Sequence, residues 1–210
     1  MTSCFRVEHM SEETPERILH FWFGTDTDEA AVAKAQASLW WGKKPEIDRQ
    51  LADRFGPVVE LASSGALDSW METPRTALAL ILLTDQFPRN IYRGTARAFA
   101  SDSLALATCL HGLEVGQDQQ LRPLERVFFY LPLEHSETLA DQERSVRLFS
   151  TLFQQTPQAQ METFRGYLTY ALRHRRVIER FGRFPHRNAA LGRTSTEEEK
   201  RFLLEPGSSF

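Results

Sequence analysis

The histidine at position 174 is the first residue of this sequence whose setting suggests chemistry. Tyr167, Ala171, His174, Ile178 and Phe181 follow the i, i+4, i+7 spacing of one helix face, so the histidine falls within an apolar stripe. A buried imidazole needs a partner on each polar nitrogen. The pattern is therefore compatible with a satisfied core residue, which is the more common case, and with a general base.

The carboxylate at position 85 occupies a similar stripe. Leu78, Leu82 and Asp85 share one helix face, and Asp85 is expected in the last turn of its helix. The helix dipole and burial both disfavour a negative charge there. Asp85 therefore needs a cation or several donors, and Arg89 and His174 are the natural candidates. A buried structural ion pair and a functional pair explain the pattern equally well.

The segment Glu134-His135-Ser136-Glu137 concentrates two carboxylates and an imidazole in a loop that we expect after Pro132. Such a set suits acid–base work or a metal ion. The alternative is structural, because acids in the first turn of a helix complement its dipole and Ser136 can act as a cap. Zinc deaminases also contain His-x-Glu, but the Pro-Cys-x-x-Cys that they need is absent here. We assign no metal and no cofactor, and metal binding at residues 134–137 stays open.

Two similar strings combine an aromatic residue, a proline and an Arg-Asn pair: Gln86-Phe87-Pro88-Arg89-Asn90 and Arg183-Phe184-Pro185-His186-Arg187-Asn188. Each follows a predicted helix, so each can be a helix-exit device. The rival interpretation is that two arginine-bearing corners converge on one ligand. Converging guanidinium groups would repel each other, so either the acids of residues 134–137 or a bound anion must lie between them. We therefore predict that Arg89 and Arg187 share one polar cavity within reach of that segment.

Helices must position these residues, because start and stop signals recur and no stretch alternates with period two. Thr14-Pro15 and Thr73-Pro74 are typical helix starts, and Ser195-x-x-Glu198 predicts a capping box. Helices are expected at about 14–23, 29–41, 45–62 with a kink or break at Gly56-Pro57, 73–85, 96–115, 123–131, 137–155 and 160–181, and after 195. This predicts an all-α, single-domain array of eight or nine antiparallel helices over residues 14–204, with flexible ends at 1–13 and 205–210.

Composition supports an ordinary globular protein. Hydrophobic residues make up 41% of the 210-residue chain and charged residues 25%, enough to bury a core without a staple. The net charge is −3, yet residues 164–193 carry eight arginines and one acid, which suggests a basic patch on an acidic body. Two isolated cysteines exclude a disulfide framework, and neither a signal peptide nor a membrane-spanning run is recognisable. We expect a cytoplasmic protein without a membrane partner.

The sequence also resembles the domain-of-unknown-function family 924 from about residue 14 to 204. The resemblance is carried by Phe21-Trp22-Phe23-Gly24, Leu83-Thr84-Asp85-Gln86-Phe87-Pro88-Arg89-Asn90, Tyr130-Leu131-Pro132-Leu133-Glu134-His135-Ser136-Glu137 with Gln142, and Arg180-Phe181-Gly182-Arg183-Phe184-Pro185-His186-Arg187-Asn188 followed by Leu191-Gly192-Arg193. Leu131 is a small departure, since the family more often has Met there. The resemblance implies a tetratricopeptide-like all-α fold, a degenerate solenoid, and it implies no activity.

These observations favour one polar pocket that binds a small anionic or polar ligand, with or without acid–base chemistry. His174, Asp85, His135 and Glu137 are the candidate catalytic residues. The candidate ligand-binding residues are Arg89, Asn90, Glu134, His186, Arg187 and Asn188. The competing hypothesis is a tetratricopeptide-like module that binds a peptide segment of another protein, which exposed Trp40, Trp41 and Trp70 would favour. Nucleic acid is disfavoured by the overall acidity, and the sequence does not decide whether the protein is an enzyme.

Overall fold

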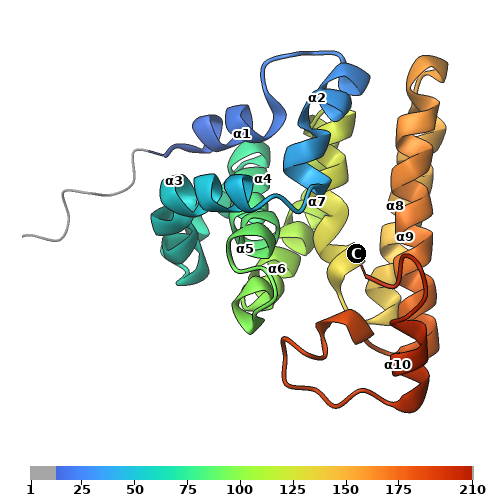
Figure 1. Cartoon of the computed structure of the whole chain (residues 1–210). Coiled ribbons are helices and arrows are strands. Elements are labelled where there is room, and N and C mark those ends of the chain that lie inside the picture. The colour runs from blue at the N-terminus through green and yellow to red at the C-terminus, as the bar shows by residue number, and fades with distance from the viewer. Residues whose placement is uncertain (1–12, 210) are drawn as a thin grey trace, which may run out of the picture.

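The computed structural model describes residues 13–209, and within that range the chain forms helices and no strand, which confirms the all-α prediction (Figure 1). The predicted flexible N-terminus lies outside the described residues except for Glu13. The helices are α1 (Pro15–Phe23), α2 (Glu29–Trp41), α3 (Pro45–Ser63), α4 (Pro74–Ile81), α5 (Phe87–Ile91), α6 (Asp102–Glu114), α7 (Pro123–His135), α8 (Leu139–Gln155), α9 (Met161–Phe181) and α10 (Glu197–Phe202). None of the described helices combines the length and the apolar character needed to cross a membrane.

Local signals set many helix boundaries. The Thr14 hydroxyl accepts a hydrogen bond from Arg17 N at 3.3 Å, and the Thr73 hydroxyl accepts one from Thr76 N at 3.5 Å. Gly24 follows α1 with φ 71° and Gly182 follows α9 with φ 68°, a backbone region that favours glycine. These starts and stops agree with the sequence prediction.

The core lies around α4, whose residues 77–81 are fully buried and pack against α1 and α6. Aromatic side chains extend this core: Trp22 of α1 has its ring centroid 5.2 Å from Phe87, which in turn lies 4.9 Å from Phe55 of α3. Helices α8 and α9 form a hairpin at one edge of the molecule, where α8 packs on α7 (Figure 1). The core thus fixes the ends of α5 and α7 relative to each other.

The chain folds back after α9, so that residues 183–188 meet the end of α7 near the base of the hairpin (Figure 1). Phe184 is fully buried against Val177 and Ile178 of α9. The described part of the tail is held as well, because Arg173 donates to the Gly207 carbonyl at 2.8 Å. Residues 205–209 therefore have contacts that the expected flexible tail would lack.

Helices continue through two prolines, at one of which the sequence predicted a kink or a break and at the other a stop. Helix α3 runs through Pro57 without interruption, and α7 runs through Pro132 to His135. A proline in a helix removes one hydrogen bond and crowds the preceding turn. At these sites the cost is offset by burial on the same helix, of Phe55 and Val58 beside Pro57 and of residues 127–134 around Pro132. His135 is consequently the last residue of a helix and not part of a loop.

The expected helix exit at Pro88 is also wrong. Residues Leu82–Gln86 form a π-helical turn, and α5 continues from it directly. Phe87 N donates to the Leu82 carbonyl, five residues back, which widens the turn just before the proline and accommodates its ring. Asp85 therefore lies within a π turn in the middle of a helical stretch, and not at a helix end.

Two smaller corrections concern the ends of helices. The helix expected from residue 96 is split into a 3-10 turn, Ala96–Phe99, and α6, which begins at Asp102. The last capping box is formed by Thr196 and Glu199, one residue after the predicted pair.

Candidate functional site

The π turn places Asp85 at the centre of a buried polar cluster. Its carboxylate is fully buried, as predicted, and accepts a hydrogen bond from Gln86 Nε2 at 2.5 Å. Its Oδ1 lies 2.7 Å from His135 Nδ1 and 3.3 Å from Arg89 Nη1. The predicted partner Arg89 is confirmed. The predicted partner His174 is wrong, and His135 takes its place because α7 ends directly opposite the π turn.

Electrostatics keep Asp85 ionised and His135 neutral. Burial alone would raise the pKa of Asp85, but the charge of Arg89 and the contact with His135 hold it well below its usual value. The pKa of His135 is lowered by burial and by Arg89, which together outweigh the attraction of Asp85. At neutral pH the imidazole is therefore neutral, with the Nδ1 proton directed at Asp85.

This arrangement leaves Nε2 of His135 as the unprotonated nitrogen. The His135 side chain is 14% exposed, and no group within residues 13–209 forms a hydrogen bond with Nε2. An imidazole whose Nδ1 is fixed by a buried carboxylate is the arrangement that orients a general base.

Arg89 and Arg187 converge, as predicted. Arg89 grips the carboxylate of Asp102 with both terminal nitrogens at 2.8 and 3.1 Å, and Arg187 Nη1 reaches the same carboxylate at 3.1 Å. Both guanidinium groups lie over the ring of Phe99, at 5.6 and 4.8 Å from its centroid. Arg187 also donates to the carbonyl of His135 at 2.9 Å. The second Phe-Pro corner, residues 183–188, thus packs on the end of α7, beside the Asp85–His135 pair.

The acid that neutralises these arginines was not predicted. Asp102 is the first residue of α6. The sequence had predicted either an acid within residues 134–137 or a bound anion between the two arginines. Burial and the nearby charge of Arg89 lower the pKa of Arg187 to about 10, so it remains protonated at neutral pH. Asp102 is the most exposed member of the group, with 24% of its side chain accessible.

His174 is buried, as predicted, but belongs to a separate pair. Its Nδ1 lies 3.0 Å from Glu134 Oε1 and 2.9 Å from the carbonyl of Tyr170. The ring of Phe184 packs on it edge-on at 5.5 Å, and the ring of His135 lies 6.1 Å away. His174 and Glu134 thus form a pair next to His135, and Asp85 is not their partner.

The other predicted residues turn away from His135. Glu137 accepts hydrogen bonds from Phe184 N at 2.7 Å and from Arg193 at 2.7 and 3.0 Å. Burial would raise the pKa of Glu137, but these donors lower it. Asn188 accepts from Arg193 at 2.9 Å, so it and Glu137 hold the second corner together. Asn90 accepts from Arg93 at 3.2 Å, on the side of α5 that faces α3.

His186 lies in the same corner, with its ring centroid 5.6 Å from that of Phe184. Burial and the charge of Arg187 lower the pKa of His186 to about 3, so it is neutral at physiological pH. Four of the predicted residues are therefore in one cluster: Asp85, Arg89, His135 and Arg187. Three others lie next to this cluster, namely Glu134, His174 and His186. The remaining three, Glu137, Asn90 and Asn188, have other partners.

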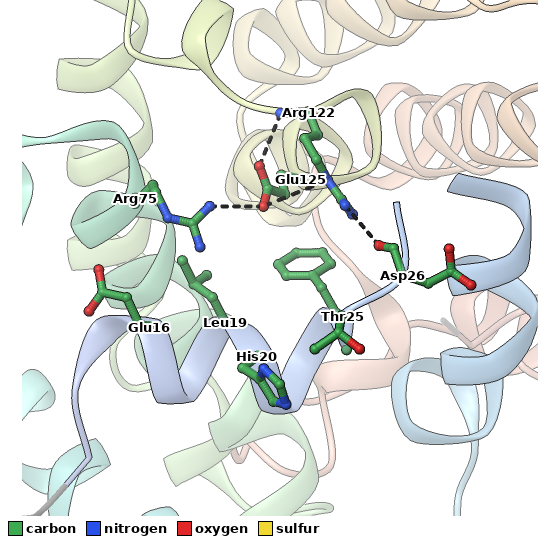
Figure 2. Close-up of a pocket in the computed structure, with 10 residues that line it drawn as sticks. Glu16, Leu19, His20, Thr25, Asp26, Arg75, Arg122 and Glu125 are labelled. Carbon is green, nitrogen blue, oxygen red and sulfur yellow. Dashed lines mark hydrogen bonds and ion pairs between the residues drawn. The ribbon is translucent and has the colours of Figure 1, made fainter. Parts of the chain in front are cut away.

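Two hollows, of about 300 and 410 Å³, border α1, and none of the predicted site residues lines either of them (Figure 2). Within residues 13–209 no three His, Cys, Asp or Glu side chains are grouped as metal ligands. Asp85, Arg89, His135 and Arg187 form a largely buried polar cluster with Asp102, and the side chains of Asp102 and His135 are partly exposed.

Comparison with known proteins places this all-helical chain in a family. It belongs to the family described as "Bacterial protein of unknown function (DUF924)", whose model matches residues 18–207. A solved structure of a protein of unknown function from Agrobacterium tumefaciens is 39% identical, with a TM-score of 0.70 over 84% of this chain and 99% of that one. Among curated proteins no similar one was found. The predicted family is therefore confirmed.

Proposed function

We propose that the cluster of Asp85, Arg89, His135 and Arg187 binds a small ligand through an anionic group and that His135 exchanges a proton with it. The 2.7 Å contact between Asp85 and His135 Nδ1 carries this proposal. It orients a neutral imidazole in a cluster that also contains Arg89, which contacts Asp85 at 3.3 Å, and Arg187, which donates to the His135 carbonyl at 2.9 Å. Oriented imidazoles of this kind serve as general bases in many unrelated enzymes.

The arginines would hold the anionic group of the ligand. Arg89 already grips a carboxylate with two nitrogens, at 2.8 and 3.1 Å, and that forked geometry suits a carboxylate or a phosphate equally. In this structure, the carboxylate of Asp102 occupies this place. Because Asp102 lies at the surface end of the cluster, we propose that the ligand exchanges with Asp102.

Inorganic phosphate and acetate are suitable probes. We expect both to stabilise the wild type in thermal denaturation at low salt, and we expect Asp102→Asn to be stabilised more strongly, since it removes the competing charge but keeps the shape. Asp48→Asn is the matched control, because the Asp48 carboxylate also accepts from two nitrogens of one arginine, Arg93, at 2.9 and 2.9 Å, and is not part of the cluster around His135. It should respond like the wild type.

An NMR titration locates the effect. Phosphate should shift the imidazole signals of His135 and leave those of the exposed His20 and His111 unchanged. Stabilisation of Asp102→Asn alone, with no response of the wild type, would show that the arginines are only a structural pair and would overturn the proposal.

Peptide binding is the second candidate. Trp41 and Tyr170 are each 50% exposed, and Trp41 stacks on Phe128 at 5.7 Å with an interplanar angle of 11°. Exposed aromatic residues are common at interfaces. Trp40 is buried and Trp70 is partly covered, which counts against this candidate. Binding to a peptide array that is lost in Trp41→Ser and retained in Asp102→Asn would support it.

A further inference from the structure

The cavity of about 300 Å³ beside α1 combines apolar side chains with charges of both signs (Figure 2). Leu19 and Phe23 of α1 supply the large apolar side chains of the lining. Arg75 from the start of α4 and Arg122 from the start of α7 stand on either side of Glu125. This volume lies at the small end of the range for ligand pockets, so it suits a molecule of a few heavy atoms.

The two arginines are only partly satisfied by the protein. Arg75 donates once, to Glu125 at 3.2 Å, and Arg122 Nη1 donates to the carbonyl of Asp26 at 2.9 Å. Each guanidinium has five N–H groups. The Nε of Arg122 is buried without a hydrogen bond, because the nearest carboxylate oxygen, on Glu29, is 3.6 Å away. Two cations thus share Glu125 and retain donors for a further acceptor.

An acid also lines the cavity, beside Arg75. Glu16, in the first turn of α1, lies on the same side as Arg75, and its carboxylate has no hydrogen bond or ion pair within residues 13–209 (Figure 2). The acids of the lining, Glu16, Asp26 and Glu125, outnumber Arg75 and Arg122. Such a lining disfavours a polyanion and favours a molecule that carries both charges.

We propose that this cavity binds a free α-amino acid. Its carboxylate would lie at the unused donors of Arg75 and Arg122, its ammonium group would face Glu16, and its side chain would cover Leu19 and Phe23. Carboxylate recognition by arginine is strong and directional, and an acid beside Arg75 gives the adjacent ammonium group a partner, which fixes the orientation of the zwitterion. The inference does not depend on the cluster around His135, which lies outside this cavity.

Calorimetric titration with glycine, alanine, leucine, glutamate and phenylalanine tests the proposal. We expect at least one of them to bind, and the N-acetyl and carboxamide derivatives of that amino acid to bind about tenfold more weakly, because each lacks one charge. Arg75→Gln and Glu16→Gln should weaken binding to a similar degree. Both side chains are exposed, so these variants should fold normally.

Arg97→Gln is the control, because Arg97 is also an exposed arginine paired with a glutamate, Glu60, and it does not line the cavity. It should bind like the wild type. The proposal is overturned if none of the five amino acids binds at millimolar concentration, or if the derivatives bind as well as the parent. It also fails if the cavity variants behave like Arg97→Gln. None of these results bears on phosphate binding at His135, so the two proposals fail separately.

Discussion

Removal of the Asp85 carboxylate should strongly destabilise the fold. Asp85→Ala leaves Arg89 and His135 without the acid that each contacts, at 3.3 and 2.7 Å, in a fully buried position. Breaking a buried charged pair in this way costs about 3–5 kcal/mol. At about 2–4 °C per kcal/mol for a chain of this size, the melting temperature should fall by about 6–20 °C. Asp48→Ala breaks a partly exposed pair with Arg93 and should cost only about 0–1 kcal/mol.

Urea denaturation followed by circular dichroism gives both free energies of unfolding, with an unchanged m-value as evidence that the same folded state is compared. Asp85→Asn serves as a second variant, since it keeps the size of the side chain and removes only its charge. We expect its loss to lie between those of the other two. If Asp85→Ala costs no more than Asp48→Ala, the carboxylate does not sustain the cluster.

Two further predictions concern pH and packing. Because burial and Arg187 lower the pKa of His186 from 6.5 to about 3, the unfolded chain binds its proton first on acidification. The stability that this histidine contributes is complete above pH 6.5 and is lost as the pH falls toward 3. The melting temperature of His186→Gln should therefore fall less than that of the wild type between pH 7 and pH 5. Equal decreases would contradict the lowered pKa of His186. A Cβ at Gly112 would lie 2.4 Å from the ring of Phe129, whereas one at Gly166 would meet nothing within 4 Å. Chemical denaturation should show Gly112→Ala destabilised by about 1–3 kcal/mol and Gly166→Ala stabilised by about 0.5–1 kcal/mol, and a stabilised Gly112→Ala would refute the packing argument.

Helix boundaries followed from the sequence where the signal is local. Thr14 and Thr73 cap the helices that follow them, and Gly24 and Gly182 end α1 and α9 with positive φ, because each of these effects involves only a few neighbouring residues. Prolines were misread for the opposite reason. Whether a helix survives a proline depends on how much the flanking turns bury, and burial is decided by the rest of the fold.

Burial of His174 and Asp85 was also predictable, since each lies in the apolar stripe of its own helix. Their partners were not. An apolar stripe predicts that a side chain faces the core, but the packing of the helices against one another determines which residues the side chain contacts there. Asp85 meets His135 because α7 ends opposite the π turn, and His174 meets Glu134 one residue earlier on the same helix. A shift of one residue along α7 thus separates the proposed general base from a supporting pair.

Charge balance explains how the cluster would accept an anion. Two converging guanidinium groups do require a carboxylate, but the sequence could not identify it, because Asp102 is 13 residues from Arg89 and 85 from Arg187. With His135 neutral, the charges of Asp85 and Asp102 already cancel those of the two arginines. An anion that entered beside Asp102 would add an uncompensated charge to a buried site, which is strongly unfavourable. The ligand in our proposal must therefore replace Asp102, and the first turn of α6 must move away from the arginines for the ligand to bind.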